Sequence, residues 1–248
     1  MSAPAPPARR VAAQARAELA MTLRRGESVL LALGIPVMLL VFFSLVRVLP
    51  TGPGAPVNFL GPGIIALAVM STGMVSLGIA TGFERSYGVL KRLGTTPLGR
   101  PGLLVAKTVA VVGLEAVQLV VLVPVAVGLG WRPAGTAAGL AVVAVVVGTV
   151  AFAGLGLLMA GSLKAETTLS AANGLYLVLL LLGGMVIPLT KLPSALAGVA
   201  RALPAAALSQ ALSGALGPAH RVGIHDWVVL AVWAVAAPVA AAVTFRWE

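Results

Sequence analysis

Charged residues are rare along this chain, and they separate long stretches that are almost entirely apolar. Charge is absent inside the intervals Glu27–Arg47, Arg47–Glu84, Arg132–Lys164, Glu166–Lys191 and Asp226–Arg246, and Glu115 is the only charge between Lys107 and Arg132. A helix that crosses the hydrocarbon core of a bilayer needs about 20 apolar residues, and each interval can hold one. We therefore predict an all-α polytopic membrane protein with six transmembrane helices, near residues 28–48, 59–82, 104–129, 137–162, 168–188 and 227–245.

Two short segments rich in proline and glycine set the limits of these predicted helices. The sequence LPTGPGAPVN (Leu49–Asn58) interrupts one long uncharged interval, so the second span begins after it. The sequence GWRPAG (Gly130–Gly135) separates the third span from the fourth in the same way. Proline and glycine clusters of this kind end helices, because proline lacks a backbone N–H and glycine is conformationally free.

Residues 8–25, ahead of the first span, have the spacing of an amphipathic helix. Val11, Ala15, Leu19 and Leu23 follow one another at steps of four residues, while arginines occupy the opposite side. This pattern predicts a helix that lies along the inner membrane surface. A solvated basic tail is the alternative interpretation.

The segment 189–226, between the fifth and sixth spans, is too long for a simple connection. It contains two weakly amphipathic stretches, opened by Pro193 and Pro204 at first-turn positions. We expect both to form short helices that lie in the outer leaflet or dip into it, because irregular backbone is costly in lipid. The whole chain, residues 1–248, is then one membrane domain.

The composition agrees with a membrane protein. Hydrophobic residues make up 59% of the chain, charged residues only 10%, and the mean hydropathy is +1.05. Soluble domains carry about 25% charged residues, so this chain could not solvate its own surface in water. The net charge of +10 does not indicate a nucleic-acid partner, because the basic residues flank apolar runs rather than decorate a soluble scaffold.

The basic residues also predict an orientation, since cytoplasmic loops are enriched in lysine and arginine. With the N-terminus inside, the inner side holds Arg9, Arg10, Arg16, Arg24, Arg25, Arg85, Lys91, Arg92, Arg100, Lys107, Lys164 and Arg246, and the outer side holds Arg47, Arg132, Lys191, Arg201 and Arg221. We therefore expect both termini in the cytoplasm. The abundance of arginine, alanine and glycine points to a GC-rich bacterial genome, and so to a bacterial plasma membrane.

The sequence offers no catalytic chemistry. It has no cysteine, and no glycine–lysine pair from which a phosphate-binding P-loop could be built, so any ATP hydrolysis belongs to a partner. The only histidines, His220 and His225, lie with Asp226 in the outer segment and do not make a convincing metal site. We expect a protein that is not an enzyme and that binds no metal.

The densest run of charge is FERSYGVLKRLGTTPLGR (Phe83–Arg100), between the second and third spans. On a helical wheel its large apolar and aromatic residues form one arc opposite Glu84, Arg85, Lys91 and Arg92; they are Phe83, Tyr87, Val89, Leu90 and Leu93. The pattern predicts one short cytoplasmic helix over Phe83–Leu93, ended by Gly94 and Pro97. Such a helix either anchors the loop at the lipid headgroups or docks on a cytoplasmic partner.

Glu115 is the one acidic residue inside a predicted span, and Gln118 shares its helix face. A charged side chain at mid-span costs about 2.5–3.5 kcal/mol, so the pair should face the bundle interior or an aqueous cavity. Two roles remain open: a polar contact between helices or subunits, or a place in a substrate or proton pathway.

The order of residues in two segments resembles that of type-2 ATP-binding-cassette (ABC) exporter permeases, with the daunorubicin-resistance branch nearest. The first segment is ER..GVLKRL..TPL (Glu84–Leu98), and the second is GGMVIPLTKLPSALAGVARALP (Gly183–Pro204). In the second segment the family's small-residue pair and later prolines correspond to Gly183, Gly184, Pro188, Pro193 and Pro204. The resemblance implies that residues 83–100 form a coupling segment against the nucleotide-binding subunit, with Glu84, Arg85, Gly88, Leu90, Arg92 and Pro97 as its functional residues.

By the same resemblance, the chain is the membrane subunit of an ATP-driven exporter of a lipophilic or amphiphilic compound, such as a drug, an antibiotic or a lipid-like molecule. ATP and Mg²⁺ would be used by a separate ATPase subunit, and this chain would bind no cofactor. Two copies of the chain would pair with two ATPases in a membrane of lipids. The alternatives are an exporter of lipid-linked glycan, and a membrane scaffold that recruits a cytoplasmic partner without transporting anything.

Overall fold

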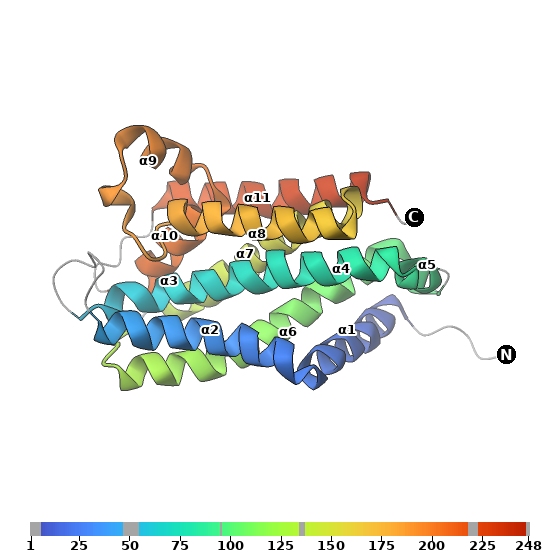
Figure 1. Cartoon of the computed structure of the whole chain (residues 1–248), viewed down its shortest axis with the longest axis horizontal. Coiled ribbons are helices and arrows are strands. Elements are labelled where there is room, and N and C mark those ends of the chain that lie inside the picture. Colours follow the sequence, from blue (N-terminus) through green and yellow to red (C-terminus); the bar gives the residue numbers. More distant parts are fainter. Residues whose placement is uncertain (1–5, 47–54, 95, 134–136, 218–222, 247–248) are drawn as a thin grey trace.

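A computed structural model describes residues 6–46, 55–94, 96–133, 137–217 and 223–246 as a bundle of helices (Figure 1). No strand occurs among these residues, so the predicted all-helical fold is confirmed. In chain order the elements are α1 (Pro7–Arg24), α2 (Gly26–Leu45), α3 (Val57–Met70), the π-helix η1 (Ser71–Ser76), α4 (Leu77–Ser86), α5 (Val89–Gly94), α6 (Gly99–Gly128), α7 (Ala138–Ser162), α8 (Ala165–Leu182), the 3₁₀ turn η3 (Leu189–Lys191), α9 (Ser194–Arg201), α10 (Pro204–Leu216) and α11 (Ile224–Thr244).

Within the part of the chain that the structure describes, five helical stretches are individually long and apolar enough to cross a membrane. They are residues 57–86 (α3, η1 and α4 in series), Pro101–Gly128 within α6, α7, α8 and α11. The bent pairs α1–α2 and α9–α10 could raise the number to seven, a range that includes the six spans predicted. The predicted end of the first span, residues 47–48, lies outside the described residues.

The helix α7 lies in the middle of the bundle and packs against α4, η1, α10 and α11 (Figure 1). Two of its glycines allow backbones to approach closely. A Cβ atom at Gly154 would lie 2.5 Å from the backbone nitrogen of Pro238 in α11, and one at Gly156 would lie 2.7 Å from the carbonyl oxygen of Met74 in η1. Because lipid tails are as apolar as the helices, packing of small residues is what holds such helices together.

The helix α10 is almost completely buried inside the protein, between α3, α7, α8 and α11. The connector before α10 also packs closely against α3, because a Cβ at Gly63 in α3 would meet the carbonyl oxygen of Met185. The neighbouring α9 is mostly exposed and meets α10 at a bend of 84°. The two predicted short helices of the outer segment therefore form, and they differ: α9 faces outward, whereas α10 is part of the core.

The bundle has two distinct ends (Figure 1). The helix α5, the first turn of α1 and the last turn of α11 lie together at one end. The helices α9 and α10 lie at the opposite end, with the first turn of α11. The first and last residues that the structure describes are thus at the same end of the bundle as the predicted coupling segment.

Replacing Gly154 with leucine should destabilise the protein by about 3 kcal/mol, the upper end for overpacking, because backbone atoms of α11 cannot move aside. Gly139→Leu, in the same helix, is the matched control, since no atom of the described residues lies within 4 Å of a Cβ built there. Thermal unfolding of the detergent-solubilised proteins measures the difference. Equal midpoints for the two variants would show that α7 and α11 do not depend on this contact.

Candidate functional site

The helical wheel predicted one continuous helix over Phe83–Leu93. In the structure this segment instead forms two helices, joined at Gly88. The helix α4 ends at Ser86, Gly88 has a positive φ of 71°, and α5 begins at Val89. A left-handed backbone of this kind suits glycine because it has no Cβ. The second helix ends at Gly94, where the sequence predicted its end.

Because of this break, the residues of the predicted apolar arc do not share one face: some are buried and others are exposed. Leu90 is only 1% exposed and packs in a cluster with Leu77, Leu103 and Leu157. Tyr87 is 73% exposed and Val89 is 40% exposed. Leu90 therefore fixes α5 to the bundle, while Tyr87 and Val89 form an exposed apolar pair at the end of the bundle.

Glu84 points into the protein, where it belongs to a cluster of charges that joins three helices. Lys107 in α6 lies 2.6 Å from Glu84 in α4 and 3.2 Å from Glu18 in α1. The Lys107 side chain is 2% exposed, against 25% for Glu84 and 13% for Glu18, and Gln14 donates a further hydrogen bond to Glu18 at 3.0 Å. Buried charges need such partners, because their desolvation is otherwise uncompensated.

Arg85, the next residue, attaches the same turn of α4 to a different neighbour. Its guanidinium donates to the carbonyl oxygen of Gly161 at 2.6 Å and to that of Leu163. The backbone N–H of Arg246 also donates to Gly161, at 3.0 Å. Carbonyls at the end of a helix lack intrahelical partners, so Arg85 satisfies the end of α7 and fixes it to α4.

The remaining residues predicted for the coupling segment lie nearer the surface. Arg92 and Pro97 are exposed, and the carbonyl oxygen of Pro97 accepts a hydrogen bond from the Arg10 guanidinium in α1. A Cβ built on Gly88 would have no atom of the described residues within 4 Å. The structure thus separates an inward pair, Glu84 and Arg85, from an outward group around Gly88 and α5.

Sequence reasoning did not find the partners of Glu84. Lys107 was counted as a flanking charge of the inner side, although it fell inside the predicted span 104–129. That position was the available signal, since a lysine several residues into an apolar span requires a partner. The identity of the partners was not visible, because Glu18 is 89 residues away in sequence.

Glu115 and Gln118 both face the interior, with 2% and 1% exposure. Thr149 in α7 is hydrogen bonded to one carboxyl oxygen of Glu115 and lies 2.8 Å from the carbonyl oxygen of Val145. The second carboxyl oxygen of Glu115 is buried and has no hydrogen-bond partner among the described residues.

Gln118 joins three elements through its side-chain amide. It donates to the carbonyl oxygen of Ala32 in α2 at 2.9 Å and accepts from Thr72 in η1 at 3.2 Å. The π-helix is therefore at the level of the buried polar residues of α6. Such π-helical turns within spans occur frequently at functional sites.

The outer motif makes the tight connection that leads from α8 to α10. Gly184 has a φ of 67°, and its carbonyl oxygen accepts a hydrogen bond from Ser209 in α10 at 3.2 Å. The prolines stand at the starts of short elements: Pro188 before η3, Pro193 before α9 and Pro204 as the first residue of α10. A Cβ at Gly183 would lie 2.5 Å from the carbonyl oxygen of Leu179. The contacts of the motif are those of a structural connector.

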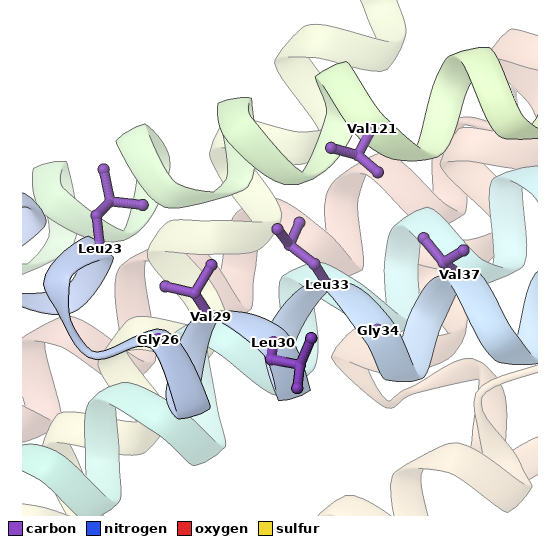
Figure 2. Close-up of a pocket in the computed structure, with 8 residues that line it drawn as sticks. All are labelled: Leu23, Gly26, Val29, Leu30, Leu33, Gly34, Val37 and Val121. Atoms are coloured by element: carbon purple, nitrogen blue, oxygen red, sulfur yellow. The ribbon is translucent and has the colours of Figure 1, made fainter.

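An open groove of about 380 Å³ runs between α1, α2 and α6 (Figure 2). Figure 2 shows its lining, which comes mainly from α2, with Leu23 from α1 and Val121 from α6: Leu23, Gly26, Val29, Leu30, Leu33, Gly34, Val37 and Val121. Every one of these residues is apolar or glycine. The groove can accept a hydrocarbon chain and offers nothing to bind a charged group or a metal.

No group of three or more histidine, cysteine, aspartate or glutamate side chains that could hold a metal ion occurs within the described ranges. His225 lies 3.8 Å from Asp226, and His220 lies outside the described residues. The fold and these sites define a multi-pass helical membrane protein. A family model described as ABC-2 type transporter matches residues 10–216, so the chain belongs to the ABC-2 type transporter family.

Membership of this family makes the chain the membrane subunit of an ABC transporter. A membrane domain of this type typically has no ATPase activity of its own and implies an ABC ATPase as partner. No curated protein matches the chain.

Replacing Lys107 with methionine should destabilise the protein by about 3–5 kcal/mol, because two carboxylates would be left without their cation. Lys191→Met is the control, since Lys191 is exposed. Adding Glu18→Gln and Glu84→Gln to Lys107→Met should restore most of the thermal stability in detergent. A triple variant as unstable as the single one would mean that packing, and not charge, is responsible.

Proposed function

We propose that this chain is the membrane subunit of an exporter in a bacterial plasma membrane, of the daunorubicin-resistance type. It moves a lipophilic or amphiphilic compound outward, while a separate subunit hydrolyses ATP with Mg²⁺ and this chain binds no cofactor. The family supports the ATPase partner. The wholly apolar groove along α2 supports a protein whose environment and cargo are rich in hydrocarbon.

The observation that carries the proposal is the exposed pair Tyr87 and Val89 beside a turn of α4 that is fixed on two sides. A side chain that contacts a moving partner must be exposed, and the element that bears it must be held firmly to transmit the motion. Tyr87 and Val89 meet the first requirement. Glu84 and Arg85 meet the second, because Glu84 pairs with Lys107 of α6 and Arg85 donates to the carbonyl oxygen of Gly161 at the end of α7.

This arrangement gives the predicted coupling residues two different tasks. Gly88, Arg92 and Pro97 belong to the surface that meets the ATPase, together with Tyr87 and Val89. Glu84, Arg85 and Leu90 act inside the chain and transmit the displacement of α5. The end of the bundle that bears α5 and the described chain ends is then the cytoplasmic end, in agreement with the excess of basic residues predicted there.

The transporter is assembled from two copies of this chain and two ATPase subunits. A single bundle of this size is too small to enclose a wide pathway, whereas two bundles can form one between them. Glu115 is the candidate contact for cationic cargo, because a carboxyl oxygen without a partner is available to a positively charged group. The substrate class is inferred from the apolar character of the chain and its family.

Replacing both Tyr87 and Val89 with alanine should reduce co-purification of the ATPase at least tenfold, as expected when exposed aromatic anchors of an interface are truncated. The fold should persist, because both side chains are exposed. The control is Val199→Ala with Ile224→Ala, two exposed apolar residues of α9 and α11. If the Tyr87 and Val89 variant binds the ATPase as well as the control does, α5 is only a membrane anchor.

Replacing Glu115 with glutamine should leave expression and ATPase binding unchanged, because shape and hydrogen bonding are kept. Transport of a cationic dye into inverted membrane vesicles should fall about tenfold, while transport of a neutral dye should be retained. Dye accumulation driven by ATP measures both. Equal rates for wild type and variant with several cationic dyes would exclude a pathway role and leave Glu115 as a contact with α7.

A further inference from the structure

The apolar groove between α1, α2 and α6 has a pair of arginines at one end. Figure 2 shows Leu23 and Gly26 at that end of the groove and Val37 at the other. In the chain, Leu23 and Gly26 stand directly on either side of Arg24 and Arg25, where α1 ends and α2 begins. Both arginines are exposed, and neither guanidinium has a hydrogen bond or ion pair with a described residue. The groove therefore has apolar walls and a cationic mouth.

The walls of the groove are held in place by contacts with α6. Gln118 of α6 donates to the carbonyl oxygen of Ala32 in α2 at 2.9 Å. Leu19 of α1 packs on the same helix, because a Cβ at Gly113 would lie 2.9 Å from its side chain. Since α1 and α2 are both fixed to α6, the space between them belongs to the fold.

The groove is about as long as one leaflet of a bilayer is deep. From Gly26 to Val37, α2 rises about 16 Å at 1.5 Å per residue, roughly half of a hydrocarbon core about 30 Å thick. Leu30, within this stretch, is 71% exposed, and a Cβ built on Gly34 would have no atom of the described residues within 4 Å. Residues 28–45 carry no charge. One acyl chain fits this length and this chemistry.

The charges at the mouth favour an anionic headgroup. Arg24 and Arg25 outnumber Glu27, the one acidic residue beside them. Arg16 is exposed and stands seven residues, about two helical turns, before Leu23, so it adds positive charge on the flank of α1 that borders the groove. Guanidinium groups bind phosphate oxygens with two parallel hydrogen bonds. A phosphate that carries no neighbouring cation of its own suits this mouth best.

We propose that the groove and its arginine pair bind one anionic phospholipid. Its acyl chain lies along α2 as far as Val37, and its phosphate is held outside the groove by Arg24 and Arg25. A second copy of this chain docked on the same surface would bring its own arginines against these, so the charge favours lipid over a second copy. The site goes beyond the proposed function and needs neither the ATPase nor a cargo.

Two photoreactive lipids test the site in vesicles that contain the full chain. Phosphatidylglycerol and phosphatidylcholine carry the same diazirine on the acyl chain, and mass spectrometry quantifies the label on Val29–Val37. Phosphatidylglycerol should label this stretch at least fivefold more, about the factor that one basic residue adds near an anionic surface. Equal labelling by the two lipids would mean that the groove is ordinary lipid-facing surface, and the proposal would be wrong.

Charge removal tests the mouth. Arg24→Gln with Arg25→Gln should bring the ratio of the two labels to about one, while the fold persists because both side chains are exposed. The matched control is Arg132→Gln with Lys191→Gln, two exposed cations at the ends of other elements, which should keep the wild-type ratio. An arginine double variant that still prefers phosphatidylglycerol would show that these residues do not hold the phosphate.

Filling the groove tests the place of the acyl chain. Gly34→Leu has room for its side chain, so it should fold normally and reduce labelling by both lipids about fivefold. Gly139→Leu on α7 is the control and should label as wild type does. Unchanged labelling of Gly34→Leu would show that the chain does not enter. Glycerol phosphate in excess should not compete; if it does, the mouth binds free phosphate and not a lipid.

Two further results would give the groove to another occupant. Displacement of the label by a transported dye would make the groove part of the cargo pathway. The native chain has no cysteine, so Leu30→Cys reports directly on a second copy. Efficient disulfide-linked dimer through Leu30→Cys would show that a second copy covers the groove, whereas monomer under the same oxidation supports the lipid.

Discussion

Close approach of backbones along α7 is the constraint on which the rest of the bundle depends. In a bilayer no hydrophobic force drives one apolar helix against another, so contacts must come from packing and from satisfied polar groups. Gly154 and Gly156 lie on different sides of α7, against α11 and η1. One central helix can thereby hold both a lipid-exposed span and the span that carries the coupling segment. Larger side chains at these positions would separate the two.

The polar residues inside the bundle are arranged around the same core, and they connect elements instead of lining a catalytic centre. Gln118 connects α6 to α2 and η1, and Thr149 connects α7 to Glu115. Lys107 connects α6 to α1 and α4. Because unpaired polar groups are costly in lipid, each connection also fixes the register of its helices. One carboxyl oxygen of Glu115 has no hydrogen-bond partner among the described residues, and this acidic group is therefore the candidate for contact with cargo.

Much of the fold could be predicted from the spacing of charges, because an uncharged run of sufficient length in a bilayer can only be a helix. The fourth span was predicted at 137–162, and α7 runs from Ala138 to Ser162. The fifth was predicted to extend to residue 188, but α8 ends at Leu182, because Gly184 turns the chain with a positive φ. The hydropathy of the sequence could not show where α8 ends, because Met185 is apolar and buried although it lies in the connector and not in a helix.

The coupling segment shows a different limit. A helical wheel assumes one continuous helix, and it cannot detect that Gly88 takes a left-handed backbone and sends Tyr87 and Leu90 in different directions. The tertiary partners of Glu84 and Arg85 could not be predicted either, because hydropathy does not show which residues distant in sequence are in contact. The order of residues was sufficient to locate the coupling segment. Which of its residues are exposed and which are buried is visible only in the folded chain.

The position of α4 shows how the proposed surface for the ATPase is connected to the rest of the bundle. At one end α4 continues through Gly88 into α5, which carries the surface for the ATPase. Along its side it meets α8, where a Cβ at Gly82 would lie 3.5 Å from Thr168. Thr168 is fully buried, so this contact lies inside the bundle. A displacement of α5 therefore reaches α8 through one helix and one close contact. Since Glu84 and Arg85 fix the same turn of α4 to α6 and α7, that displacement moves a connected body and not a single loop.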